Sequence, residues 1–398
     1  MQTTRQQASS TWLTRWWLVL GVVTVATALR PLVVTVGPVL PDLRQDLDLG
    51  AASAALLTAL PVACFGVGAF AGPALSRRLG IDSALTAAMA LLVLGAILRV
   101  LGGTAWLFAG TVLVGAAIAV GNVLLPALVR RDFPSRVGVV TGIYTSTVAI
   151  TSTLAALVAV PLADLTGAGW RGPFLGWGLA GAAALLVWLA HLRTSRRVPH
   201  TGTAAAPPAF GLLRSPTALG LTVFMGLQSI GFYVLVAWLP SLLQDSGLTP
   251  AAAGALLSLA TVLGIPAGLV APILAGRAAQ QSMLAVGSSA ITVAGWVGLL
   301  LAPDVVPAVW AVLLGVGTGS SFPIALVLIG LRSGNPATTP QLSAVVQGVG
   351  YLIAATGPLL VGLLHDTSGG WTVPLCALIV LTAAQGVSGW VAGRARTV

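Results

Sequence analysis

The chain has 398 residues, of which 57% are hydrophobic and 7% are charged, and its formal net charge is +10. A soluble domain carries about 25% charged residues, so this chain has too few charges to cover a water-exposed surface. A nucleic-acid partner is not expected, because the arginines lie at the ends of apolar stretches. Those stretches are longer than the roughly ten-residue strands of a membrane barrel. Since lipid-exposed backbone must be paired internally, the composition predicts an all-α membrane protein in a lipid bilayer.

Apolar runs separated by charged residues, Gly and Pro predict twelve transmembrane helices. Each run has about the 20 residues that a helix needs to cross a bilayer. The predicted helices cover residues 16–39, 51–75, 83–103, 105–129, 137–163, 171–192, 217–243, 251–275, 282–302, 306–331, 341–365 and 371–393.

A polar segment divides the predicted helices into two sets of six. Residues 193–216 form the longest polar stretch, and their Arg, Pro and Ala content is typical of a linker. We therefore expect an N-terminal half at 1–192 and a C-terminal half at 217–398. Most arginines lie on the side of the termini, whereas Arg44 and Arg171 lie on the opposite side. Because arginines favour the cytoplasmic side, the linker and both termini are predicted to be cytoplasmic.

The two halves repeat at an offset near 200 residues. The segment Pro41–Asp46 matches Pro240–Asp245, and Trp170 matches Trp371. A parallel repeat of six plus six helices is the plan of the major facilitator transporters, which bind substrate near the midplane between the halves.

Three segments resemble known transporter motifs. The first is Leu29-Arg30-Pro31 followed by Val36–Pro41. The second combines Gly121–Pro126, Arg130–Gly138 and Thr141–Tyr144. The third is the loop Gly72–Gly80. The loop resembles the general loop G-x-x-x-D-R-x-G of the major facilitator superfamily. The other two segments resemble the cyanate permease / 2-nitroimidazole transporter family.

The resemblance implies a major facilitator fold and a secondary transporter that works by alternating access in the plasma membrane. It implies a small-molecule substrate, no cofactor and a monomer. Grouped His, Asp or Cys side chains at membrane depth, as an enzyme would need, are missing from the sequence, so neither catalytic residues nor a metal site are expected.

One position departs from the family loop, because Ser76 stands where the motif has Asp. An acid that closes a cytoplasmic gate against Arg77 or Arg78 must therefore come from elsewhere. Asp132 and Asp82 are the cytoplasmic acids available. We interpret Arg77, Arg78 and Asp132 as gating residues, with ordinary solvated loop charges as the alternative.

Arg30 is the strongest candidate for substrate binding. It lies inside the first predicted helix, where an Arg costs at least a few kcal/mol, and Pro31 beside it removes a backbone donor. None of the nine acids, all Asp, falls in the middle of a helix, so an anionic substrate can supply the counter-charge. Alternatively, Arg30 bonds carbonyls freed by Pro31 or snorkels outward. Arg99, nearer the outer end of the third helix, is expected to snorkel to the interface.

Further polar side chains fall inside predicted helices and are candidates for substrate contacts, with interhelical hydrogen bonds as the alternative for each. They are Asn122, Tyr144, Gln228, Tyr233, Ser321, Gln347 and Tyr351. We expect transport of a small anion or anion-like solute similar to cyanate. The alternative is export of neutral or aromatic compounds such as nitroimidazoles, where tyrosines and apolar walls dominate.

Overall fold

The computed structural model describes residues 17–194 and 209–398, so most of the predicted linker 193–216 lies outside the described residues. Every regular element in those two ranges is a helix. Eleven helices there are long and apolar enough to cross a membrane, or twelve if one bent pair counts as a single span. The prediction of an all-α membrane protein is confirmed.

The helices follow the predicted spans closely. A helix over residues 17–28 comes first. The others are α2 (Pro31–Val34), α3 (Leu40–Asp46), α4 (Ala51–Gly68), α5 (Ala71–Leu79), α6 (Ile81–Val100), α7 (Thr104–Asp132), α8 (Val137–Thr166), α9 (Arg171–Thr194), the 3₁₀ helix η1 (Ala209–Arg214), α10 (Pro216–Asp245), α11 (Pro250–Arg277), α12 (Ser282–Leu301), α13 (Pro307–Arg332), α14 (Thr339–Ser368) and α15 (Thr372–Ala392).

Two predicted spans are not single straight helices. The first is interrupted between residue 28 and α2. The second consists of α4 and α5, which are bent by 56° against each other. By contrast α10, the first helix of the second repeat, runs unbroken for 30 residues.

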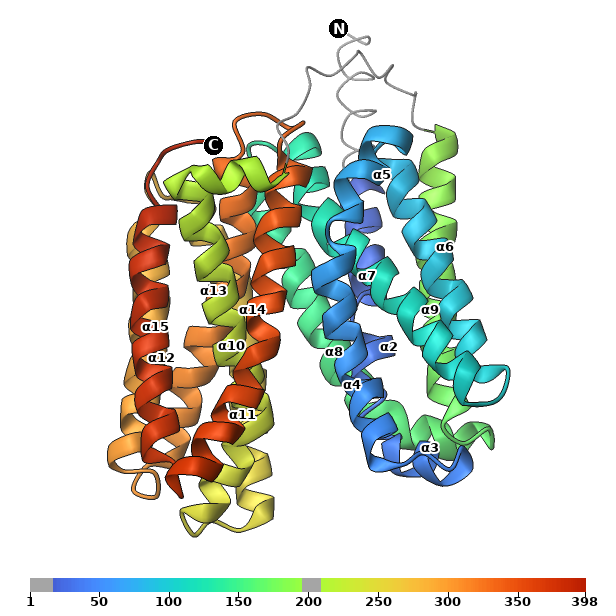
Figure 1. The fold of residues 1–398 in the computed structure, drawn as a ribbon. Coiled ribbons are helices and arrows are strands. Elements are labelled where there is room, and N and C mark those ends of the chain that lie inside the picture. Colours follow the sequence, from blue (N-terminus) through green and yellow to red (C-terminus); the bar gives the residue numbers. More distant parts are fainter. Residues whose placement is uncertain (1–16, 195–208) are drawn as a thin grey trace, which may run out of the picture. The chain divides into compact units, whose positions relative to one another are not determined.

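The helices form two compact units. Unit 1 holds the described chain up to Leu125 and from Thr147 to the end of α9. Unit 2 holds Pro126–Ser146 and the described chain from Ala209 onward. Within each unit the long helices lie side by side (Figure 1). The predicted halves of six helices each follow the sequence repeat, whereas the units follow contacts within the structure. The division into six plus six helices stays a prediction.

Glycine explains why the start of α8 belongs to unit 2. A Cβ on Gly138 would lie 2.1 Å from the carbonyl oxygen of Pro272 and 2.9 Å from the Cα of Gly276. Two turns further along, the Thr145 hydroxyl lies 3.3 Å from the carbonyl oxygen of Gly268. Side chains any larger than glycine's hydrogen would therefore hold α8 and α11 apart at this point.

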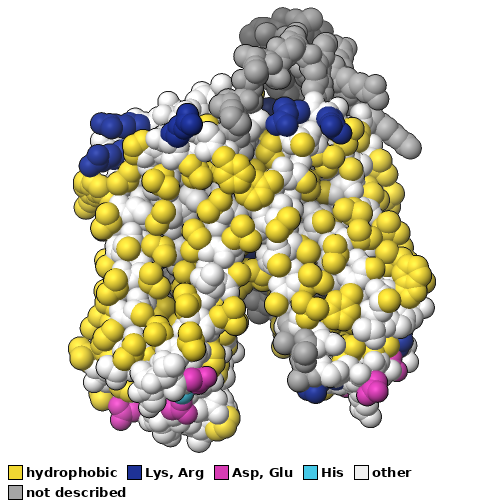
Figure 2. Space-filling model, in the orientation of Figure 1, with side chains coloured by type: hydrophobic (Ala, Val, Ile, Leu, Met, Phe, Trp, Pro, Cys, Tyr) yellow, Lys and Arg dark blue, Asp and Glu magenta, His cyan; other side chains and the backbone are white. Residues whose placement is uncertain are grey.

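Charges collect at the helix ends in each unit. Dark blue arginines lie mainly at one end, which we name the Arg-rich end, and magenta aspartates mark the opposite, Asp-rich end (Figure 2). Apolar side chains cover the surface in between. Leucines such as Leu179 and Leu359 are 72% and 76% exposed, which is the surface that lipid tails require.

Candidate functional site

The interruption of the first span begins at Arg30. Pro31 has no N–H, so the helical hydrogen-bond pattern stops, and Arg30 takes the N-cap position of α2. The Arg30 carbonyl then accepts from the amides of Val33 and Val34, at 3.0 and 3.1 Å. A new short helix therefore starts at Arg30, and its side chain leaves the chain at the break itself.

The Arg30 side chain is half-buried within unit 1. Its guanidinium carbon lies 5.2 Å from the centre of the Phe65 ring, which α4 supplies. Phe65 is 1% exposed, so the ring is a fixed wall. A cation over an aromatic face gains electrostatic stabilisation, so this contact favours the charged guanidinium at the break.

Arg99 is a second cation in the interior of unit 1, and the expectation that it snorkels to the interface is wrong. Its side chain is completely buried. Its Nη1 donates to the Leu32 carbonyl at 2.5 Å, and its Nε donates to the Thr111 hydroxyl at 3.1 Å. The guanidinium also lies over Phe174 of α9, at 5.2 Å. Arg99 turns inward because the carbonyl near the break and the Thr111 hydroxyl offer it acceptors.

Unit 2 contains a contrasting set of neutral polar groups. Tyr144 in α8 and Tyr351 in α14 are 4% and 2% exposed, so both phenols are buried. Gln347, one turn before Tyr351, donates to the Ser343 hydroxyl at 2.8 Å. The Tyr144 hydroxyl has no hydrogen-bond partner among the described residues. The structure thus brings three predicted contacts, Tyr144, Gln347 and Tyr351, into one unit on two helices.

Of the other predicted contacts, Gln228 and Tyr233 make local contacts in unit 2, and Asn122 belongs to unit 1. Gln228 donates to the Met225 carbonyl at 3.1 Å and to the neighbouring Ser229 hydroxyl at 2.6 Å. Tyr233 is half-buried and packs on Phe232. Asn122 is half-buried in α7, within unit 1.

Ser321 belongs to a hydroxyl and amide cluster between helices of unit 2. It donates to the Gly317 carbonyl at 2.8 Å and lies 3.0 Å from the Ser288 hydroxyl of α12. Gln385 of α15 donates to Ser321 at 3.2 Å. These bonds join α12, α13 and α15. Ser321 therefore makes the interhelical hydrogen bonds that were the alternative to a substrate contact.

The predicted gating residues occupy the Arg-rich end. Arg77 and Arg78 lie in the last turn of α5 and are exposed. Asp132 accepts two bonds from its neighbour Arg131, at 2.7 and 2.8 Å. Asp82 lies 3.9 Å from the Nε2 of His191. The gating role itself stays a prediction.

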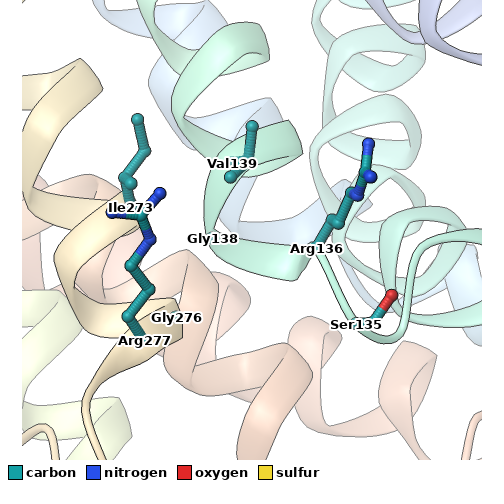
Figure 3. A pocket seen from close by; sticks show the side chains of 7 residues that line it. All are labelled: Ser135, Arg136, Gly138, Val139, Ile273, Gly276 and Arg277. Carbon is teal, nitrogen blue, oxygen red and sulfur yellow. The ribbon is translucent and has the colours of Figure 1, made fainter.

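A cavity of about 370 Å³ opens at the same end of unit 2. It lies where the turn before α8 meets the end of α11, and is lined by Ser135, Arg136, Gly138, Val139, Ile273, Gly276 and Arg277. In Figure 3 the side chains of Arg136 and Arg277 lie on opposite sides of the start of α8 and do not converge. Both arginines are exposed, so the opening is basic but is not arranged around one bound group.

The Asp-rich end carries the same contact in both units, which we name the Asp–Trp clamp. In unit 1 the indole N–H of Trp170 donates to Asp46 at 2.9 Å, and in unit 2 that of Trp371 donates to Asp245 at 2.8 Å. These are the residues that the sequence repeat aligns. Arg171 completes the clamp of unit 1 with an ion pair to Asp46 at 2.9 Å.

The sequence matches the family model described as Major Facilitator Superfamily over residues 17–339. The chain belongs to the major facilitator superfamily. It is therefore a multi-pass membrane transporter that acts on small molecules, and not an enzyme. The family resemblance predicted from the motifs is confirmed.

Three curated relatives of this superfamily member align along most of its length. An uncharacterized transporter of Bacillus subtilis (strain 168), YycB, is 38% identical, with 96% of this chain and 94% of that protein covered. The 2-nitroimidazole transporter of Escherichia coli (strain K12) is 36% identical, with 95% of each chain covered. The cyanate transport protein CynX of the same organism is 30% identical, with 89% and 91% covered.

Solved structures share the fold at much lower identity. The E. coli fucose:proton symporter FucP matches with a TM-score of 0.72 at 14% identity, over 94% of this chain and 97% of that chain. The human organic anion transporter MFSD10 matches with a TM-score of 0.73 at 15% identity, over 94% and 99%. These likenesses establish the architecture of a major facilitator and nothing about the substrate.

Proposed function

We propose that this major facilitator transports a small anion or anion-like solute, of the size and shape of cyanate, and that Arg30 binds its charged group. The observation that carries the proposal is the place of Arg30: a half-buried guanidinium at the break of the first span, stacked on the rigid Phe65 ring. A planar guanidinium suits flat, delocalised acceptors. The cyanate transport protein among the relatives supports the same class of substrate.

The charge distribution in the sequence agrees with an anionic substrate. All nine aspartates lie at or near helix ends, whereas Arg30 is half-buried and Arg99 is fully buried in unit 1. In a medium of low dielectric constant such charges act over longer distances than in water. The interior of unit 1 is therefore suited to attract a negative solute.

The second candidate is export of neutral aromatic compounds, and the buried phenols favour it. Tyr144 keeps a buried hydroxyl without a hydrogen-bond partner in the described residues, and the Tyr351 phenol in the same unit is also buried. Such a group suits a neutral acceptor between aromatic walls. One relative is named a 2-nitroimidazole transporter.

A thermal-shift comparison of the purified wild-type protein distinguishes the two candidates. A ligand that binds the folded state increases the free energy of unfolding by mass action, by about 2.7 kcal/mol at one hundred times its Kd. The melting temperature rises as a result. We expect sodium cyanate to stabilise the protein and sodium chloride at the same ionic strength not to do so. Stabilisation by 2-nitroimidazole alone, abolished in Tyr144→Phe, would instead establish the second candidate.

We also propose that the protein lies in the plasma membrane with both termini cytoplasmic, because arginines dominate one end of each unit. Single cysteines placed at Asp304 and at Arg277, in a background lacking Cys64 and Cys376, test this orientation. In intact cells an impermeant thiol reagent should label the cysteine at 304 and spare the one at 277. The reverse pattern would overturn the orientation.

Arg77, Arg78 and Asp132 are proposed to close the cytoplasmic side of the pathway. If so, Asp132→Asn should slow cyanate transport in vesicles while cyanate affinity stays near the wild-type value. Unchanged transport in the folded variant would reduce Asp132 to a surface charge that pairs with Arg131.

A further inference from the structure

Among the described residues, no backbone amide donates to the carbonyl of Leu32, which lies just after the break in the first span. In a continuous helix the Leu32 carbonyl would accept from the amide of Val36. Here the Val36 amide donates to Val33, and the Thr35 amide donates to Pro31. The donor that reaches the Leu32 carbonyl is the Nη1 of Arg99, at 2.5 Å.

Arg99 is held in place from three directions. The Thr111 hydroxyl donates its proton to the Leu107 carbonyl at 2.7 Å, so its lone pairs accept from the Nε of Arg99 at 3.1 Å. The Phe174 ring lies against the guanidinium at 5.2 Å. Thus α7 and α9 fix the guanidinium of α6, and the guanidinium in turn fixes the segment just after the break.

Unit 2 is a natural control, because its first helix is not broken. With the repeat offsets of 199 to 201 residues, Pro31 corresponds to Ile230, and Arg99, Thr111 and Phe174 correspond to Leu299, Ala311 and Leu375. All four counterparts belong to one apolar cluster of unit 2. Where α10 is continuous its carbonyls are paired within the helix, and the same place in the fold holds only apolar side chains.

We propose that Arg99 is a positioning residue for the substrate site: by bonding the Leu32 carbonyl it holds the segment 29–39, and with it the guanidinium of Arg30, in the geometry that binds substrate. Leu32 lies two residues from Arg30, so movement of the segment moves the anchor. The functional half of this inference, that Arg99 affects substrate binding, rests on the proposed function of Arg30. The structural half, the restraint on segment 29–39, is independent of any substrate.

Arg99→Leu, which introduces the side chain type that unit 2 has there, tests both halves. Backbone hydrogen exchange of segment 29–39 in nanodiscs reports the restraint, and a titration with sodium cyanate reports the anchor. Since the Leu32 acceptor is left unpaired in the interior, we expect exchange in this segment to speed up by about tenfold and the Kd for cyanate to rise by a similar factor.

Arg332→Leu is the matched control, because Arg332 is also a buried arginine that donates to backbone carbonyls, those of Ala392 and Gly393 at 2.9 and 2.8 Å. It should lower the melting temperature without altering exchange in segment 29–39. If Arg99→Leu does not accumulate, Thr111→Val removes only the acceptor of the Nε and should give a smaller change in the same direction.

The outcomes separate the two claims. Unchanged exchange in 29–39 in folded Arg99→Leu would overturn the inference, and faster exchange with unchanged cyanate affinity would overturn its functional half. Arg30→Gln is measured alongside. If Arg30→Gln binds cyanate normally while Arg99→Leu still speeds up exchange in segment 29–39, the proposed function of Arg30 is overturned. The restraint of the segment by Arg99 is then still supported.

Discussion

Units 1 and 2 consist mainly of the first and the second predicted repeat, respectively, but their interiors differ. In unit 1, one half-buried arginine lies at the break of the first span, and a fully buried arginine is bonded just beyond that break. Unit 2 contains an unbroken first helix, an apolar cluster, and buried phenols and amides. A helix break releases backbone acceptors, and a buried arginine is stable where such acceptors exist. The comparison teaches that the break and the buried charge belong together.

The largest expected effect comes from placing the charge in the wrong unit. Leu299→Arg introduces a guanidinium into the apolar cluster of unit 2, where Leu299 is 2% exposed and α10 has no break. We expect a loss of at least about 2.5 kcal/mol in stability, seen as a strongly lowered melting temperature or failure to accumulate.

Leu301→Arg is the matched control for this substitution. Leu301 is the last residue of α12 and is 76% exposed, so the new side chain reaches water. Its melting temperature should stay near the wild-type value. If Leu299→Arg were equally harmless, a buried arginine would not need the backbone acceptors of a nearby helix break or helix end, and the comparison would fail.

A smaller effect is expected from the feature that the units share. Trp170→Phe and Trp371→Phe keep an aromatic ring but remove the indole donor of each Asp–Trp clamp. Because the aspartates are accessible to water, each substitution should lower the melting temperature by about 2 °C or less. The double variant should show the sum of the two shifts. A large excess over that sum would mean that the clamps are not separate elements.

The smallest effect is a pH dependence of the clamp in unit 1. The hydrogen bond from Trp170, and then that from Arg171, lower the pKa of Asp46 below its ordinary value of 3.8. A pKa that is lower in the folded state stabilises the protein at pH values above the ordinary pKa. This stabilisation disappears as the pH falls through the lowered pKa.

The difference in melting temperature between wild type and Trp170→Phe should therefore be constant near neutral pH and shrink below about pH 4. Unfolding scans at neutral and acidic pH measure it. A difference that grows toward low pH would contradict the assigned cause of the pKa shift.

The sequence predicted the helices and the family, because apolar length and charge placement directly reflect the bilayer. The clamp could have been predicted too, since Asp46 and Trp170 align with Asp245 and Trp371. What the sequence did not predict is which way a side chain faces. Arg99 was expected at the interface from its depth alone, whereas its acceptors come from α2 and α7, which are distant along the chain.

Ser321 illustrates the same limit at a neutral residue. Its depth in α13 suggested a substrate contact, but only the structure places its hydroxyl against Ser288 and Gln385 of neighbouring helices. The bend between α4 and α5 was also missed, although Pro73 cannot donate to the carbonyl of Ala69, four residues before it, where the two helices separate. Helix faces follow from packing, which a single sequence does not display.

The central claim is that Arg30 binds the charged group of the substrate. Calorimetric titration of sodium cyanate into wild type, Arg30→Lys and Arg30→Gln, with melting temperatures from the same preparations, tests it most directly. We predict that Lys, which keeps the charge but loses the planar fork, weakens binding. Gln should weaken binding by about one hundredfold or more while the protein stays folded. Wild-type affinity in a well-folded Arg30→Gln protein would contradict the claim.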